Sequence, residues 1–305
     1  MSFGGHFWTI APRALMWIAP AVAPAAVRIR IPVADPDRSG VSLTGYLADR
    51  TGTDTCVLLV HGLGGGDDSH YCLEAATAAE KLGVASLRLS LRGADREGTD
   101  FYHGGLTADL HAALAAPELA RFSRLMIFGF SLGGHVTLRL ATEAGVDPRL
   151  KAVASLCTPL DLSACRAEID KPRSWLYRRH LLDGLREIYR GVAARASVPT
   201  PLEVVLKIRT MYDWDAATVV RRYGFRDPEH YYATVTVGPV MDRLRLPTLY
   251  VAATDDPIVP RSTVDPFLTR PLPNLTVRWI ERGGHVGFPR RARVDESILA
   301  WLLAR

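Results

Sequence analysis

The pentapeptide Gly129-Phe-Ser-Leu-Gly133 places a single serine between a strand-like run and a helix-like run. Residues 124–130 are mostly apolar, and residues 132–140 begin a helical pattern. In a Gly-x-Ser-x-Gly turn the flanking glycines have no Cβ to clash with the tight backbone, so the serine Oγ is exposed. The pattern alone also occurs by chance, but a strand before it and a helix after it are the context of a nucleophile elbow. We therefore predict that Ser131 is a catalytic nucleophile.

A glycine-rich turn follows an earlier strand-like run. Residues 56–60 are all apolar and lead directly into His61-Gly-Leu-Gly-Gly-Gly66. One backbone N–H from such a turn, together with that of the residue after the nucleophile, can stabilise the oxyanion of a tetrahedral intermediate. We assign these donors to Leu63 and Leu132 and expect a structural role for His61. The glycine run could instead be a flexible loop, whereas a phosphate cradle lacks its Gly-Lys-Ser/Thr ending.

An acid and a base follow Ser131 in the chain order of this kind of triad, Ser…Asp…His. Asp255 and Asp256 stand just past the strand-like run 249–254, where a carboxylate can orient an imidazole. Asp256, directly before Pro257, is the preferred acid, and Asp255 is the runner-up. His285 lies in a glycine-rich loop after the run 275–280 and is the predicted base.

Short apolar runs alternate with helix-patterned stretches along the chain, which predicts an α/β fold with a mostly parallel sheet. The expected helices are residues 71–82, 106–116, 132–144 and 295–303. The expected strands are residues 27–33, 41–47, 56–60, 84–89, 125–130, 152–156, 248–252 and 275–280. With the nucleophile elbow, this order indicates an α/β-hydrolase fold with an eight-stranded sheet flanked by helices. We expect one domain, residues 1–305.

A long excursion without a central strand separates two late strands. Residues 165–246 carry helical patterns at 175–189 and 202–211, and so long an insertion is usually functional. We expect a helical cap or lid over the site, with most of its aromatic residues in the cap core. Between Arg166 and Arg226 there are 13 Lys/Arg against 7 Asp/Glu, which accounts for the net charge of +5. This surplus indicates either a solvated helical surface or attraction to anionic lipids or acidic substrates.

Several classes of function find no support in the sequence. No basic stripe interleaved with aromatic residues indicates nucleic-acid binding. The four cysteines form no CxxC pair and no zinc-spaced cluster, so neither metal nor cofactor is expected and free thiols are the default. The apolar run 14–27 is too short and too rich in proline to cross a bilayer, and the strand-like residues after it argue against a signal peptide. We expect a cytoplasmic protein, with peripheral contact to a membrane surface as an option.

The motifs around these residues resemble those of the YheT-like α/β-hydrolases, whose eukaryotic relatives include membrane-associated lipid esterases. The matching stretches lie at 61–65, 69–71, 91–93, 102–109, 129–134, 158–162, 223–225, 231–232, 255–257 and 283–288, with a fainter match at 5–12. The resemblance therefore covers nearly the whole chain, and it implies carboxylic-ester hydrolysis without a metal or cofactor. The chain departs from the family pattern with Gly64, often acidic in the family, and with His135, often asparagine. Both departures bear on substrate preference.

Together these observations predict a serine hydrolase that cleaves a small-molecule acyl ester, with a lipid as one candidate, through an acyl-enzyme on Ser131. An acyltransferase or a thioesterase would use the same residues. A non-catalytic lipid-binding scaffold is a third reading, motivated by the basic insertion and the apolar N-terminus. The sequence does not fix the acyl-chain length, the headgroup or the oligomeric state.

Overall fold

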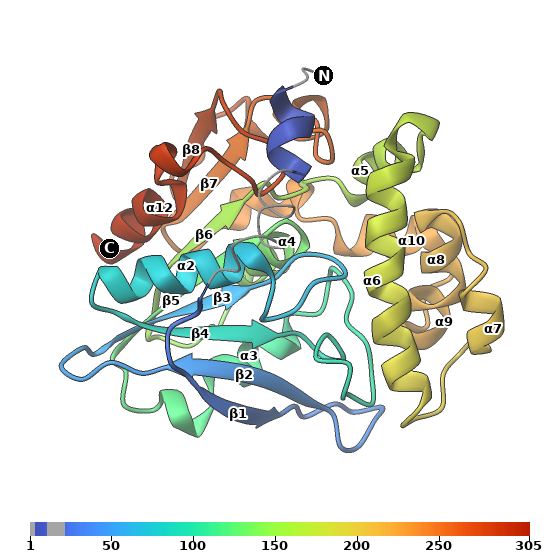
Figure 1. Ribbon diagram of the computed structural model, residues 1–305, viewed down its shortest axis with the longest axis horizontal. Coiled ribbons are helices and arrows are strands. Elements are labelled where there is room, and N and C mark those ends of the chain that lie inside the picture. The colour runs from blue at the N-terminus through green and yellow to red at the C-terminus, as the bar shows by residue number, and fades with distance from the viewer. Residues whose placement is uncertain (1–3, 11–21) are drawn as a thin grey trace.

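A computed structural model describes residues 4–10 and 22–305. Its centre is an eight-stranded sheet in the order β1-β2-β4-β3-β5-β6-β7-β8 (Figure 1). Strand β2 pairs antiparallel with both β1 and β4, and every pair from β4 onward in this order is parallel. The predicted α/β fold with an eight-stranded, mostly parallel sheet is confirmed. The strands are β1 (Val27–Pro32), β2 (Ser42–Ala48), β3 (Thr55–Val60), β4 (Ala85–Ser90), β5 (Arg124–Phe130), β6 (Leu150–Leu156), β7 (Thr248–Ala253) and β8 (Leu275–Ile280).

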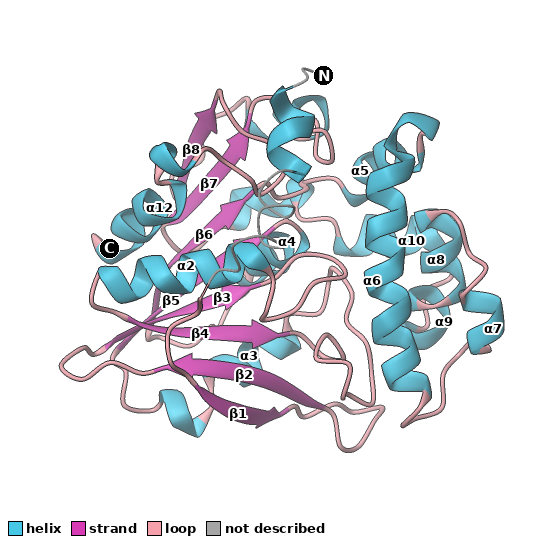
Figure 2. Cartoon of the chain, in the orientation of Figure 1, coloured by secondary structure: helices cyan, strands magenta, loops and turns pink. Residues whose placement is uncertain are grey.

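The central strands are apolar throughout because both faces of the sheet are covered (Figure 2). Along β3, Val57 and Leu59 face one core, while Leu58 and Val60 face the other. Helices α2 (His70–Lys81) and α12 (Val294–Leu303) pack together on the first face. Helices α3 (Ala108–Leu114) and α4 (Leu132–Thr142) cover the second. Each of these four helices begins and ends within a few residues of the predicted bounds.

The chain between β6 and β7 forms a group of helices beside the sheet edge at which the parallel strands end (Figure 1). The predicted helix 175–189 is present and extends to residue 193, but the single helix expected at 202–211 is wrong. Two short helices replace it, because the Thr210 hydroxyl accepts from the Asp213 N–H and starts a new helix there. The helices are α5 (Leu162–Asp170), α6 (Trp175–Ala193), α7 (Leu202–Val205), α8 (Met211–Ala217), α9 (Val219–Tyr223) and α10 (Pro228–Val235).

A buried ion network joins these helices to the sheet. Arg92 is 1% exposed and contacts the carboxylates of Asp109 and Asp100 at 2.7 and 3.1 Å. Arg222, on α9, approaches Asp100 from the other side with a contact of 2.7 Å. Arg38 lies 3.7 Å from the same carboxylate, so three arginines surround one fully buried acid. Loss of one partner of a buried ion pair strongly destabilises a fold. This network fixes α9 against the loop that follows β4.

The N-terminal residues 4–10 are helical and lie near the top of α6 in the orientation of Figure 1. His6 Nδ1 is 2.6 Å from the Tyr177 hydroxyl, which joins this helix to α6. Most of the apolar run 14–27 lies outside the described residues, and within residues 4–10 and 22–305 no helix is both long and apolar enough to cross a membrane. All four cysteines are buried and unpaired.

Candidate active site

Ser131 occupies a strained turn between β5 and α4. Its backbone has φ 50° and ψ −119°, a left-handed conformation that non-glycine residues rarely adopt. A Cβ on Gly133 would lie 2.3 Å from the carbonyl oxygen of His61, and one on Gly129 would lie 2.6 Å from that of Gly133. Glycine at both positions is therefore a steric requirement. The turn ends with Ser131 at the N-terminus of α4, as the sequence predicted.

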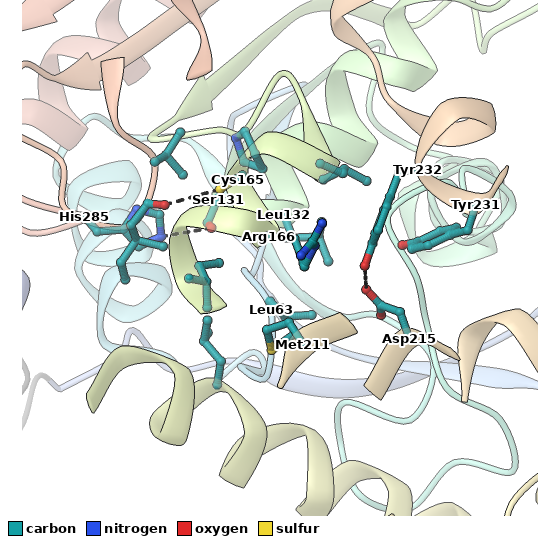
Figure 3. A pocket seen from close by; sticks show the side chains of 16 residues that line it. Leu63, Ser131, Leu132, Cys165, Arg166, Met211, Asp215, Tyr231, Tyr232 and His285 are labelled. Carbon is teal, nitrogen blue, oxygen red and sulfur yellow. Dashed lines mark hydrogen bonds between the residues drawn. The ribbon is translucent and has the colours of Figure 1, made fainter. Parts of the chain in front are cut away.

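The hydroxyl of Ser131 contacts the side chain of His285, which lies in the loop after β8 (Figure 3). Ser131 Oγ lies 2.9 Å from His285 Nε2, and His285 Nδ1 lies 2.9 Å from Asp256 Oδ2. With Nδ1 protonated and donating to the carboxylate, Nε2 is left as the acceptor for the serine proton. The structure thus brings together the three residues predicted for nucleophile, base and acid.

The carboxylate of Asp256 is oriented by the turn it begins. Its Oδ1 accepts the backbone N–H groups of Ile258 and Val259 at 2.8 and 2.9 Å, and the residue is 2% exposed. Oδ2 is thereby left to face His285. The sequence kept Asp255 as a runner-up, and the geometry places Asp256, not Asp255, against the imidazole.

Leu63 and Leu132, the residues predicted to supply the oxyanion donors, both line the same pocket as Ser131. Among the described residues, neither amide has a hydrogen-bond acceptor. The amides on either side of Leu63 are occupied, since Gly62 N–H donates to the Tyr71 hydroxyl at 3.0 Å and Gly64 N–H to that of Tyr102 at 2.7 Å. The two tyrosines hold the turn so that the Leu63 N–H is left available. Nothing in the sequence pattern showed that their hydroxyls reach this turn.

Two other histidines near Ser131 are structural. His61 Nε2 accepts the backbone N–H of Leu91 at 3.1 Å, and its Nδ1 lies 2.7 Å from the Gly62 carbonyl. His135, one turn along α4, lies between the carbonyls of Pro159 and Val235. Burial lowers the pKa of each imidazole to about 4, so both are neutral near pH 7. The expected structural role of His61 agrees with these contacts.

The N-terminal helix reaches the site through Thr9, a residue that the sequence did not single out. Thr9 Oγ1 accepts the backbone N–H of His285 at 2.9 Å. The approach is close, because a Cβ on Gly284 would lie 2.2 Å from the Gly5 carbonyl, and a Cβ on Gly5 would lie 2.0 Å from the carbonyl of Asp255. Residues 4–10 are thus packed against both loops that carry the candidate acid and base.

A pocket with about 640 Å³ of empty space opens beside Ser131, between the sheet and helices α5 to α10. Its wall next to the serine is apolar, and polar groups gather at the wall formed by α5, α8 and α10 (Figure 3). There the Tyr232 hydroxyl donates to Asp215 Oδ2 at 2.6 Å, and burial raises the pKa of Asp215 to about 7. Tyr231 and Tyr232 line the pocket, although most cap aromatics were expected in the cap core. The other lining residues are Leu63, Leu132, Pro159, Leu162, Cys165, Arg166, Ile169, Leu181, Met211, Ile258, Val259 and His285.

One cluster among the described residues has atoms that could approach a metal ion. The ligand atoms of Cys157, Asp256 and His285 lie within 4.8 Å of one another. The imidazole is already hydrogen-bonded to the Asp256 carboxylate and to Ser131, and burial raises the pKa of the Cys157 thiol well above its usual value. A protonated thiol is a poor ligand, so the donor set does not suit a metal ion.

Several curated proteins are similar in sequence to this chain, and those named for an activity are esterases and lipases. The chain is 29% identical over 245 residues to the putative esterase YheT of Escherichia coli, covering 76% of the chain and 70% of that protein. It is 24% identical over 250 residues to phospholipase ABHD3 of Mus musculus, covering 80% of the chain and 61% of that protein. A match to the embryogenesis-associated protein EMB8 of Picea glauca, at 28% identity, covers 76% of the chain and about half of that protein, 53%.

Solved structures share the fold at low sequence identity. The esterase Pf2001 of Pyrococcus furiosus superposes with a TM-score of 0.59 at 18% identity, over 92% of each chain. The alpha/beta hydrolase GrgF of Penicillium sp. sh18 superposes with a TM-score of 0.59 at 16% identity, over 91% of this chain and 97% of the GrgF chain. The model of the alpha/beta hydrolase family matches residues 57–296, which include all three residues of the Ser131 hydrogen-bonded series. The chain belongs to the alpha/beta hydrolase family, and its curated relatives place it with the YheT-like hydrolases.

Proposed function

We propose that this protein is a serine hydrolase that cleaves carboxylic esters through an acyl-enzyme on Ser131. The observation that carries the proposal is the continuous series from Ser131 Oγ to His285 to Asp256, with 2.9 Å at each of its two steps. The series opens into a largely apolar pocket. Relatives named esterase, phospholipase and monoacylglycerol lipase support ester hydrolysis as the reaction class.

In the proposed acylation step, Ser131 Oγ attacks the acyl carbon while His285 Nε2 takes the hydroxyl proton. The electron pair of the carbonyl moves to its oxygen, where the amides of Leu63 and Leu132 stabilise the negative charge. As the tetrahedral intermediate collapses, the bond to the leaving alcohol breaks, and His285 returns the proton to that alcohol. Asp256 stabilises the imidazolium and keeps Nε2 directed at Ser131.

In the deacylation step, water replaces the alcohol and the same groups act again. His285 accepts a proton from the attacking water, the acyl carbon passes through a second oxyanion, and Ser131 Oγ leaves with the proton. The products are a carboxylic acid and the regenerated enzyme. If an alcohol or a thiol enters at this point in place of water, the outcome is acyl transfer, so the partitioning of the acyl-enzyme separates a hydrolase from an acyltransferase.

The test is hydrolysis of a panel of p-nitrophenyl esters from acetate to palmitate by the wild-type protein and by Ser131→Ala. The proposal predicts turnover with the wild type and loss of about 10⁴-fold or more in kcat with the variant. Turnover undiminished in Ser131→Ala would refute the assignment of the nucleophile. Product analysis with an added alcohol or thiol distinguishes hydrolysis from acyl transfer, and a thioester offered as substrate tests thioester cleavage. Binding of lipid without any turnover would favour the non-catalytic scaffold.

We also propose that the protein meets lipid substrates at a membrane surface. Phe7 of the N-terminal helix and Trp175 and Leu176 of α6 are exposed, and the hydrogen bond between His6 and Tyr177 holds these two segments together. Adjacent exposed apolar side chains are typical of interfacial contacts. Co-sedimentation with anionic vesicles, weakened by Trp175→Ser, is the expected result. Equal sedimentation of the two proteins would contradict this contact.

A further inference from the structure

Arg166 brings a positive charge into the pocket that also contains Ser131 (Figure 3). Its side chain is 24% exposed, and within the described part of the chain its guanidinium donates no hydrogen bond to another protein group. The buried Nε atom is without a partner, and the nearest ion pair, to Asp170 Oδ2, is 3.8 Å long. A guanidinium with five N–H donors normally forms several hydrogen bonds when it is this far removed from water. Because the protein supplies no acceptor for these N–H donors, we expect a bound ligand to supply one.

The surroundings of Arg166 orient it without neutralising it fully. Its guanidinium lies over the rings of Tyr212 and Tyr232, at 5.3 and 5.8 Å from their centroids. The Asp170 carboxylate is engaged by the backbone N–H groups of Met211 and Tyr212 at the start of α8, at 2.8 and 3.2 Å. The aromatic faces favour a cation at this position and hold its plane. The N–H donors are therefore available to a ligand.

Asp215 lies at the same wall of the pocket, where the Tyr232 hydroxyl donates to it. Its carboxyl is removed from water, which raises its pKa to about 7. In the neutral form it presents no repelling charge to an anion bound by Arg166, and its O–H can donate to such an anion. The wall thus combines a cation with a carboxyl group that is partly neutral near pH 7.

We propose that Arg166, with Asp215 and Tyr232, forms a subsite for an oxyanion carried by the substrate, so that the enzyme prefers esters bearing a carboxylate or a phosphate over uncharged esters of the same length. This inference rests on the proposed function, and it names the substrate class of the same pocket. The apolar wall beside Ser131 takes the hydrocarbon between the scissile ester and the anionic group. Arginine is suited to this task because its planar fork matches both carboxylate and phosphate oxygens.

The test compares mono-p-nitrophenyl adipate with p-nitrophenyl hexanoate, which share a six-carbon acyl chain and differ in the terminal carboxylate. The wild type should hydrolyse the adipate ester with a kcat/KM about 10- to 100-fold higher, the range expected for a hydrogen bond to a charged group. Arg166→Met should abolish this preference, so that the variant hydrolyses the two esters with similar kcat/KM. The matched control, Arg173→Met, removes an exposed arginine that does not line the pocket and should keep the preference. Dihexanoyl phosphatidic acid against dihexanoylglycerol repeats the comparison for phosphate and tells the two oxyanion sources apart.

A binding measurement separates failure of the subsite from failure of the proposed function. Calorimetry of Ser131→Ala with the adipate and hexanoate monoesters requires no turnover. Tighter binding of the adipate monoester, lost when Arg166→Met is added, supports the subsite even if the wild type hydrolyses neither ester. Equal affinity for the two monoesters, or a preference for the adipate monoester that survives Arg166→Met, would overturn the proposal.

Discussion

The backbone N–H of His285 donates to Oγ1 of Thr9 across 2.9 Å, although the two residues lie 276 positions apart in the chain. The N-terminal helix therefore holds the loop that carries the proposed base. Because the backbone of His285 makes this hydrogen bond, the bond fixes the position of the His285 Cα and leaves both imidazole nitrogens free for Ser131 and Asp256. Proton transfer depends on the alignment of His285 Nε2 with Ser131 Oγ. A displacement of this loop by a few tenths of an ångström would alter that alignment.

Thr9→Val is predicted to lower kcat by about three- to tenfold with little change in KM, the cost of a neutral hydrogen bond. The hydroxyl also donates to the Gly5 carbonyl, so some local loosening of the helix is expected. Thr9→Ser retains the hydroxyl and should recover most of the lost rate. If Thr9→Val and Thr9→Ser were equally impaired, the hydrogen bond to His285 would not be the cause.

Asp256→Asn is predicted to lower kcat by about 10⁴-fold, because the amide no longer selects the productive tautomer of His285. The Ile258 and Val259 N–H groups still find an oxygen acceptor, so the fold should persist. Asp255→Asn is the matched control and should remain within a few-fold of the wild type. Steady-state kinetics with circular dichroism as a folding check decides between the two carboxylates, and a larger loss in Asp255→Asn would reverse the assignment.

Tyr102→Phe is predicted to lower kcat by about tenfold, through the turn that presents the Leu63 amide. The Tyr102 hydroxyl accepts the N–H of Gly64 and donates to the Gly62 carbonyl, so its loss frees both ends of that turn. Removing an oxyanion donor outright costs about 10²–10³ in kcat, and loosening one should cost less. Kinetics on a short ester, with KM as the control for substrate binding, measures this effect. An unchanged kcat would show that the turn holds without the hydroxyl.

The preference for oxyanion-bearing esters should decrease as the pH rises through about 7. Burial raises the pKa of Asp215 to that value, so the group is neutral below it and negatively charged above it. The charged and titratable groups that act on it are Arg166 and Asp170 of α5 and Tyr232 of α10. The ratio of kcat/KM for the adipate and hexanoate esters isolates this effect, because both esters use the same proposed catalytic groups. In Asp215→Asn the ratio should not change between pH 6 and 8.5, and a ratio that still fell would exclude Asp215.

Arg222→Met is predicted to destabilise the fold by about 3 kcal/mol, because the buried Asp100 carboxylate loses the arginine that lies nearest to it. Urea denaturation gives the free energy of unfolding. Adding Asp100→Asn to Arg222→Met removes the charge left behind, so the double variant should be less destabilised than the sum of the single variants. Strict additivity would mean that the two residues are not energetically coupled.

Much of this architecture could be predicted because it depends on local patterns. The apolar runs that became β3 and β5 are continuous since both faces of the sheet are covered, and Ser131 stands where a strand meets a helix. The order of serine, acid and histidine followed from the same pattern. The helix predicted at 202–211 failed because a capping hydroxyl at Thr210, not apolar spacing, decides where α8 begins.

The remaining site residues depend on contacts between distant segments. Single hydroxyl groups contact the site from distant parts of the chain, namely those of Thr9, Tyr71 and Tyr102. These contacts form only in the folded chain, and no residue spacing in the sequence predicts them. The choice between Asp255 and Asp256 likewise required the turn that directs one carboxylate at His285. Arg166 was counted in the basic surplus of the insertion, yet its position in the pocket distinguishes it from the exposed arginines there.

Covalent labelling of Ser131 tests the central claim most directly. A fluorophosphonate reacts with an activated serine hydroxyl, and mass spectrometry of the digested protein locates the adduct. The account predicts one adduct, on Ser131, that disappears in Ser131→Ala and forms far more slowly in His285→Ala, which keeps the serine but removes its base. Absence of labelling at Ser131 in the folded wild type, or labelling as fast in His285→Ala, would contradict it.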